Sequence, residues 1–385
     1  MRIAFLGTFD LSKPRTRMLR ESLRQIDPDL KEIGFDVWRG VGDKSLVTGI
    51  GARARILFRM IAAYPVLIAR YLFAGRHDVV VIGYMGLFDV LVLAPLAKLR
   101  GKPVVWDAFL SIYDTYARDR GLARESSIVA KALRVMERMA ARLADYVVLD
   151  TKAHAAMMGR IHQIPSQKLA SVLVGAEAGS FASGDRALAG PAGDRVKVLF
   201  YGQFIPLHGI GTIVDAALDP RGMAFDWIIV GTGQEAASID RRLDEAGADH
   251  ITRITWIEYE ELQRAIGDAD ITLGIFGTSE KAASVIPNKV YQALLCAKPI
   301  VTQESGAMRE LAGEGSAGLY LVPPGDPAGL LDALERFAAE RGSLPGDLYT
   351  DLIPRFAASK RTEDWRAILE QATGRPASET QEGAQ

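Results

Sequence analysis

The sequence contains one cysteine, Cys296, among 385 residues. A single cysteine cannot form an intrachain disulfide or a thiolate zinc site, so we expect a reducing, cytoplasmic compartment. The formal net charge of −1 gives the molecule as a whole no attraction for nucleic acid. The most hydrophobic window, 56–75, is interrupted by Arg59, Pro65 and Arg70, which argues against a membrane-spanning helix. The N-terminus also lacks the apolar core of a signal peptide.

Acidic residues are absent between Asp43 and Asp78, where several cations occur beside aromatic and aliphatic residues. This pattern fits a buried helix with a charged outer face, or a helix that lies on an anionic membrane surface. We expect peripheral contact with the inner face of the cell membrane through residues 53–76, without tight anchoring. The cations are Lys44, Arg53, Arg55, Arg59, Arg70 and Arg76.

The first half of the chain alternates short apolar runs with helical patterns. Runs such as 79–82 contain no polar residue, which is typical of strands buried on both faces of a parallel sheet. We expect strands at 3–6, 35–38, 79–82, 104–106 and 146–149, and helices at 15–25, 53–74, 87–99 and 127–144.

Residues 182–195 lose this periodicity and gain glycine, proline and small residues, so we expect an interdomain linker there. The alternation then restarts, which predicts an α/β protein with two Rossmann-like, doubly wound domains facing each other across a cleft. The predicted strands are 197–201, 226–230, 271–275 and 300–302, and the helices are 212–218, 235–246, 288–297 and 327–341. The predicted units are domains at 1–185 and 186–355, a helix at 356–373 that packs back on the first domain, and a flexible tail at 374–385.

The segment 276–299 carries cations and hydroxyls where a strand gives way to a helix. Lys281 and Lys289, with Ser279 and Ser284, follow the apolar run 270–275. Parallel sheets bind ligands at the carboxyl ends of their strands, and helix N-termini favour anions. The segment therefore predicts a site for a phosphate ester and indicates sugar-nucleotide chemistry.

Two glycine-containing turns follow strands in the second half. Gly202 to Gly209 opens a helix, where glycine lets the backbone approach a diphosphate and His208 adds a donor. A plain strand-to-helix turn is the alternative. Gly231 and Gly233 form only a GxG, which is too weak for a dinucleotide fingerprint, so we expect a ligand-facing turn there.

Charged residues follow the first strand as well. Gly7 and Thr8 precede Arg15 and Arg17, and these cations could contact a phosphate or a second substrate across the cleft. A solvated helix start is an equally good interpretation of the same residues.

Four aspartates near the predicted strands could carry chemistry. Asp107 ends a buried strand, where a carboxylate can orient or deprotonate a hydroxyl or cap the next helix, and we favour the functional role. For Asp114 both interpretations remain open. The DxD formed by Asp268 and Asp270 precedes a strand, so we interpret it as a helix end and strand start and predict no metal site.

With these residues identified, the sequence resembles the family 4 glycosyltransferases of the GT-B fold over nearly its whole length. The likeness is clearest at YGQFIPLHGIGTI (201–213), IIVGTGQE (228–235), 254–275 and IPNKVYQALLCAKPIV (286–301), with VVLDTKAHAAMM (147–158) and VLVGAEAGSF (172–181) in the first half. The resemblance implies sugar transfer from a nucleoside diphosphate sugar, with retention and without a metal. It also implies donor binding by the second domain and acceptor binding by the first.

The resemblance assigns roles by motif position. The family's two glutamates fall on Ser284, which would contact sugar hydroxyls, and Gln292, which would contact the ribose. The phosphate-loop Arg and Lys fall on Gln203 and His208, and the usual first-domain His is replaced near Asp107. Because these changes remove donor-site charge, other cations must neutralise the diphosphate; we expect Lys281, Lys289 and either Arg15 or Arg17 to do so.

The implied function is sugar transfer to a lipid-linked or cell-envelope glycan at the cytoplasmic face of the membrane. Asp107, Lys281 and His208 are the expected catalytic residues, with the cations stabilising the leaving diphosphate. No metal or cofactor is expected besides the donor substrate. The expected donor-binding residues are Gly202, Gln203, Gly209, Gly231, Gly233, Ser284, Asn288, Lys289 and Gln292, and the acceptor or phosphate side is Gly7, Thr8, Arg15 and Arg17.

Two other functions fit parts of this pattern. A catalytically degenerate GT-B protein that binds a glycan or a partner transferase would explain Ser284 and the missing phosphate-loop cations. A sugar-nucleotide epimerase would need acids suited to elimination at the sugar, and the sequence shows no clear set.

Overall fold

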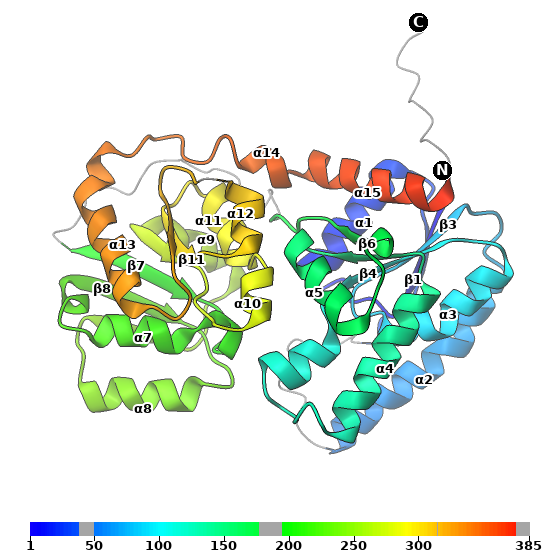
Figure 1. Ribbon diagram of the computed structural model, residues 1–385, viewed down its shortest axis with the longest axis horizontal. Coiled ribbons are helices and arrows are strands. Elements are labelled where there is room, and N and C mark those ends of the chain that lie inside the picture. The colour runs from blue at the N-terminus through cyan, green and yellow to red at the C-terminus, as the bar shows by residue number, and fades with distance from the viewer. Residues whose placement is uncertain (38–49, 177–194, 314, 375–385) are drawn as a thin grey trace, which may run out of the picture.

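The computed structural model describes residues 1–37, 50–176, 195–313 and 315–374, which form two α/β domains lying side by side (Figure 1). Each domain is built on a six-stranded sheet, and all strand pairs are parallel. This architecture confirms the predicted α/β class with two Rossmann-like domains.

The first domain has the sheet order β2-β1-β3-β4-β5-β6. The middle strand β3 is fully buried because helices cover both faces of the sheet, which explains its uninterrupted apolar run. The elements are β1 (Ile3–Gly7), α1 (Pro14–Ile26), β2 (Lys31–Gly34), α2 (Ile50–Leu72), β3 (Val79–Ile82), α3 (Leu87–Leu99), β4 (Val104–Phe109), the π-helix η2 (Asp114–Asp119), α4 (Ile128–Leu143), β5 (Tyr146–Leu149), α5 (Lys152–His162), the 3-10 helix η3 (Ser166–Lys168) and β6 (Leu169–Ser171).

The second domain has the sheet order β12-β11-β10-β7-β8-β9. From β7 the chain adds strands first on one side (β8, β9) and then on the other (β10, β11, β12). Open α/β sheets bind their ligands at such a switch point, which here lies between β7 and β10. The elements are β7 (Val196–Tyr201), η4 (Pro206–His208), α7 (Ile210–Leu218), η5 (Gly222–Ala224), β8 (Phe225–Val230), α8 (Ala236–Ala246), β9 (Ile251–Ile254), α9 (Tyr259–Asp268), β10 (Ile271–Leu273), α10 (Glu280–Ser284), α11 (Asn288–Leu295), β11 (Ile300–Gln303), α12 (Gly306–Ala312), β12 (Leu319–Val322), α13 (Pro327–Glu340) and η6 (Arg341–Ser343).

The C-terminal helices lead from the second domain back to the first. After α14 (Ile353–Phe356), helix α15 (Ala358–Thr373) runs along α1, and its buried Trp365 packs with Leu19 of α1 and Phe5 of β1 (Figure 1). Helices α2, α3 and α4 cover the opposite face of the sheet. Among the described residues, no helix combines the length and the apolar character needed to cross a bilayer.

One predicted strand is wrong. The apolar run 35–38 was expected to form the second strand, but the strand that pairs with β1 is the more polar segment Lys31–Gly34. β2 is an edge strand, so its residues need not be uniformly apolar. Phe35 and Val37 follow it as loop, and residue 38 lies outside the described residues.

Candidate functional site

A cavity of about 450 Å³ lies between the two domains. The turns after β7 and β10 form its second-domain wall, while the segments after β4 and β5 form the opposite wall. Seven of the residues predicted for the site line it, namely Gly202, Gln203, His208, Lys281, Asn288, Lys289 and Gln292. The structure therefore brings the predicted cations of the second domain to one place.

Lys289 lies in the first turn of α11 and is almost completely buried. Its Nζ has no hydrogen-bond partner and lies 3.9 Å from the centroid of the Phe200 ring. Burial lowers the pKa of the ammonium well below its ordinary value. An unpaired buried cation is unfavourable, so this side of the cavity is suited to an anion that would restore the charged form.

His208 stands beside Lys289 at the end of the turn that follows β7. Its Nδ1 donates to the carbonyl of Gln203, which leaves Nε2 with a free lone pair in the neutral ring. Burial, reinforced by the charge of Lys289, lowers the pKa of His208 well below its ordinary value. A neutral imidazole that gains a proton beside an anion fits this position.

Gly202 separates these two side chains. It adopts a φ of +147°, and a Cβ there would lie 2.9 Å from Lys289 Nζ and 3.1 Å from His208 Cε1. Behind it, a Cβ on Gly231 would lie 1.8 Å from the Gly202 carbonyl oxygen, so the two turns pack backbone to backbone. Gly209 and Gly233 lie outside the cavity lining, as does Gly231, and these glycines shape the turns behind the wall.

Lys281 contrasts with Lys289, although both line the cavity. Its Nζ donates to Thr115 Oγ1 at 2.5 Å and lies 4.0 Å from Asp119 Oδ2, both in η2 of the first domain. Burial lowers the pKa of Lys281, while Asp119 and Asp114 oppose that shift. The charge of Lys281 is therefore partly balanced across the domain interface.

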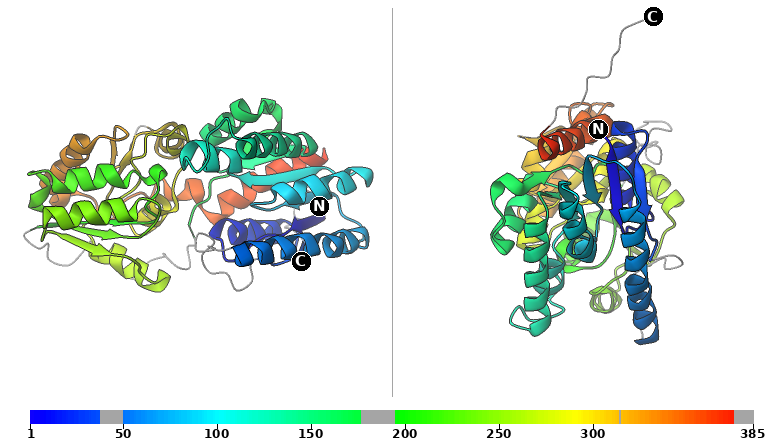
Figure 2. Two further views of the ribbon diagram at one scale, coloured as in Figure 1. Left: turned by 90° about the horizontal axis from the view of Figure 1, so that it is seen from below. Right: turned by 90° about the vertical axis from the view of Figure 1, so that its right-hand side faces the viewer.

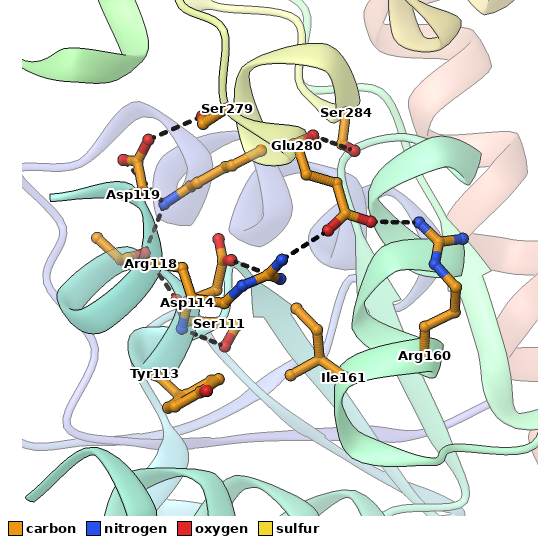
Figure 3. Close-up of polar contacts among 12 residues, drawn as sticks. Ser111, Tyr113, Asp114, Arg118, Asp119, Arg160, Ile161, Ser279, Glu280 and Ser284 are labelled. Atoms are coloured by element: carbon orange, nitrogen blue, oxygen red, sulfur yellow. Dashed lines mark hydrogen bonds and ion pairs between the residues drawn. The ribbon is translucent and has the colours of Figure 1, made fainter. Parts of the chain in front are cut away.

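The interface around Lys281 is held by further polar contacts. Glu280 accepts from Arg118 at 2.9 Å and from Arg160 at 2.6 Å, while Ser279 Oγ donates to Asp119 at 3.0 Å. Figure 3 shows the side chain of Glu280 extending from α10 between Arg118 of η2 and Arg160 of α5. Hydrogen bonds from Arg160 and Arg118 lower the pKa of Glu280.

The two positions matched to the family's glutamates behave differently. Gln292 lines the cavity, and its Oε1 accepts from Tyr201 Oη at 3.1 Å. Ser284 lies outside the lining, because its Oγ donates to the Glu280 carbonyl, while its own carbonyl accepts from Thr151 Oγ1.

The predicted first-domain residues do not gather at the cavity. Asp107 was expected at the cleft edge, but it is fully buried in an ion pair with Arg15 at 2.6 Å. Arg15 also donates to the carbonyl of Val172 at 2.8 Å, so this pair ties β4 to α1 and the segment after β6. Neither residue lines the cavity, which leaves neither free to contact a ligand there.

The remaining first-domain predictions also have local partners. Arg17 donates to the carbonyls of Leu11 and Ser12. Thr8 donates to Asp89 through its amide at 2.8 Å and through its hydroxyl, and Gly7 packs against the same carboxylate. None of these residues lines the cavity.

Sequence reasoning missed the polar residues of the first-domain wall, namely Thr115, Asp119, Arg120, Asp150 and His154. Asp150 directly follows β5, so the strand-end argument applied to Asp107 also pointed to it. Arg120 follows η2, and its Nε is buried without a hydrogen-bond partner. π-helices often mark functional sites, but this one has no recognisable sequence pattern. Among the described residues, no cluster of His, Cys, Asp and Glu side chains could hold a metal ion.

Comparisons with known proteins agree with this architecture. A family model described as "Glycosyl transferases group 1" matches residues 195–340, which is most of the second domain. None of the curated proteins matches this sequence. The fold is that of the GT-B glycosyltransferases: solved structures of such enzymes match over nearly the whole chain.

Three solved structures illustrate the similarity. The lipopolysaccharide outer core galactosyltransferase WaaB, in its apo form, shares 15% identity, with 96% of this chain and 100% of that chain covered at a TM-score of 0.67. Sucrose-phosphate synthase from Thermosynechococcus elongatus shares 17%, with 96% of each chain covered and a TM-score of 0.64. Anabaena HepE in complex with UDP shares 13%, with 97% and 96% covered and a TM-score of 0.61. At these identities the likeness establishes the fold.

Proposed function

We propose that the protein is a glycosyltransferase that binds a nucleoside diphosphate sugar in the interdomain cavity and transfers the sugar to an acceptor. The observation that carries this proposal is Lys289, whose buried amino group on the cavity wall has no hydrogen-bond partner. The group 1 glycosyltransferase match over the same domain supports it, as does the binding of UDP by HepE, a protein of the same fold.

The proposed donor site uses three positively charged or protonatable groups. Lys289, His208 and Arg120 would surround the diphosphate, and Gln292 would hydrogen-bond the ribose. Gly202 would allow the phosphates to approach the backbone closely. As the bond between sugar and diphosphate breaks, these groups would stabilise the charge on the departing phosphate. We propose retention of configuration and no metal, in line with the family that the sequence resembles.

The role that we propose for Lys281 differs from the one expected from the sequence. Its contacts with Thr115 and Asp119 hold the two domains together over the cavity. We assign it to closure of the cleft, which would exclude water from the donor sugar. With Asp107 buried in its ion pair, acceptor orientation falls to other groups of the first-domain wall.

We further propose that the acceptor is a lipid-linked or cell-envelope glycan reached at the inner face of the membrane. Helices α2 and α4 extend beyond the first-domain sheet in the same direction (Figures 1 and 2). They and the segment after α2 expose large apolar side chains next to arginines and lysines, which is typical of peripheral membrane contact. These side chains include Phe58 (72% exposed), Phe73 (88%) and Ile128 (86%).

Vesicle co-sedimentation tests the membrane contact. The protein should bind vesicles that contain phosphatidylserine and bind neutral phosphatidylcholine vesicles less, and the paired changes Phe58→Ser and Phe73→Ser should weaken binding several-fold. The matched control is Trp256→Ser, since Trp256 is also exposed but lies in the second domain. Equal binding of the F58S/F73S variant and the control to anionic vesicles would remove this part of the proposal.

Isothermal titration with UDP, GDP and ADP, followed by the sugar donors of whichever binds, tests the central proposal. Binding at micromolar to low millimolar concentration is expected. No binding of any nucleoside diphosphate at millimolar concentration would contradict it.

A catalytically degenerate binding protein is the second candidate. The observation that favours it is Ser284, which stands where the family that the sequence resembles has a glutamate. Its hydroxyl donates to the Glu280 carbonyl. Sugar transfer by the purified protein from a bound donor to a membrane lipid extract would dismiss this alternative.

A further inference from the structure

The first-domain wall of the cavity holds an aspartate–histidine pair that the donor site does not use. Asp150 immediately follows β5, and Thr151 caps α5 by accepting from the amide of His154 at 2.9 Å. This cap brings His154 back over the strand end, where its Nδ1 lies 2.6 Å from Asp150 Oδ1. Both side chains are nearly completely buried, and both line the cavity.

The contact fixes which nitrogen of His154 is available. A carboxylate oxygen only accepts, so Nδ1 carries the proton. The other nitrogen, Nε2, is buried and has no hydrogen-bond partner. A buried polar atom without a partner is unfavourable, and a ligand group that hydrogen-bonds to it would remove that cost.

The surroundings of this pair differ from those of the opposite wall. Asp114 of η2 and Lys281 of α10 lie within electrostatic reach of it, and the charge of Lys281 is partly balanced by Asp119. Of the three groups proposed to surround the diphosphate, Lys289 and His208 belong to the other domain, and Arg120 is the one on this wall. The acids beside this oriented imidazole, Asp150 and Asp114, disfavour a phosphate at His154 and suit a neutral hydroxyl.

We propose that His154, held by Asp150, binds the hydroxyl group of the acceptor that receives the sugar. The hydroxyl donates to His154 Nε2, so its oxygen faces the donor sugar across the cavity. Asp150 is a positioning residue that acts through His154. The ligand class is an alcohol of a carbohydrate or polyol acceptor, and the inference rests on the proposed glycosyltransferase function.

Two substitutions of His154 separate binding from folding. In His154→Asn the amide can still donate to Asp150 but does not reach the Nε2 position, whereas in His154→Gln a longer amide can reach it. The assay follows radiolabelled sugar from the best-binding nucleotide sugar into a membrane lipid extract, and in parallel its hydrolysis by water. Binding of UDP and thermal unfolding are measured on each variant.

Transfer to lipid should fall about tenfold in H154N through a raised acceptor KM, as expected for a lost buried hydrogen bond. UDP affinity and donor hydrolysis should stay within about twofold of the wild-type values, and H154Q should recover part of the transfer. Asp150→Asn should reduce transfer in the same direction. Unchanged transfer by H154N, or an equal loss of UDP binding and transfer, would overturn the inference while leaving the proposed donor site intact. Failure of the wild-type protein to bind UDP, GDP or ADP would instead reject the proposed function and this inference with it.

Discussion

Two lysines of the segment 276–299 differ in whether they have polar partners. Lys281 of α10 contacts a hydroxyl and a carboxylate of the first domain, while Lys289 of α11 is enclosed by Phe200, Tyr201 and the Gly202 turn without a hydrogen-bond partner. A charge whose partners are protein groups holds structure together, whereas a buried charge without them favours a ligand that supplies the missing partner. The comparison therefore assigns Lys281 to closure of the cleft and Lys289 to ligand binding, although the two lysines are eight positions apart.

The largest expected effect is at Lys289. Lys289→Met should weaken UDP binding about 10- to 100-fold, because a charge-assisted hydrogen bond contributes about 1.5–3 kcal/mol. The same change should raise the melting temperature of the unliganded protein, since it removes a buried polar group that lacks a partner. Calorimetry and thermal unfolding measure both effects.

Lys360→Met is the matched control for that change. Lys360 lies on α15 and contacts Glu363 and Asp364 at the surface, away from the cavity. It should leave UDP affinity unchanged. If K289M and K360M bind UDP equally well, Lys289 does not contact the diphosphate.

Gly202 offers the next largest effect. Gly202→Ala should weaken UDP binding about tenfold, because the new methyl group would meet Lys289 Nζ and His208 and would strain a backbone with φ of +147°. Gly211→Ala is the control, since a Cβ there has open space in helix α7. An unchanged affinity of G202A, measured by the same titration, would show that the phosphates bind away from this turn.

The sequence predicted the second-domain wall better than the first. Lys281 and Lys289 follow a buried strand, so the rule that ligands bind at the carboxyl ends of strands found them without any knowledge of their partners. It could not distinguish them, because Thr115 and Asp119, which balance Lys281, lie far away in the sequence. For the same reason Asp107 suggested a free carboxylate, although its partner Arg15 lies on α1.

The fold was predictable where strands are buried on both faces. The runs of β3 and β5 are apolar and were located correctly. The strand β2 was displaced, and β6, β9 and β12 were not identified. All four are edge strands, whose hydrogen bonds come from a single neighbour. Edge strands are selected by pairing geometry, which the sequence pattern does not contain.

Binding of the nucleotide should also depend on pH. Burial lowers the pKa of Lys289 in the unliganded protein, and a diphosphate beside it would raise that pKa, so binding is accompanied by proton uptake. The affinity for the nucleotide should therefore fall, by up to tenfold per pH unit, as pH rises from the pKa of Lys289 in the unliganded protein to its pKa in the complex. His208 contributes in the same direction, because burial and Lys289 lower its pKa.

Calorimetry in two buffers of different ionisation enthalpy measures this uptake directly. At about pH 8 the nucleotide is fully ionised, since its second phosphate pKa is about 6. The wild-type protein should take up protons there, and K289M should take up fewer. Equal proton uptake by the two proteins would assign the effect to other groups.

The smallest expected effect tests the other side of the comparison, the α10 interface. Glu280→Gln should weaken the contacts with Arg118 and Arg160 and shift the protein toward a more open arrangement. UDP affinity should change only about twofold, because Glu280 is partly exposed and solvent screens its ion pairs. The pKa of Glu280 is lowered by the two arginines, so the stabilising contact is present above the ordinary glutamate pKa and is lost as pH falls through the lowered value. Small-angle X-ray scattering at neutral and acidic pH measures the opening, and Glu363→Gln, an exposed change on α15, is the control. If E280Q opens no more than E363Q, the interface is held by Lys281, Ser279 and the apolar contacts, and the charge balance at α10 contributes little to closure.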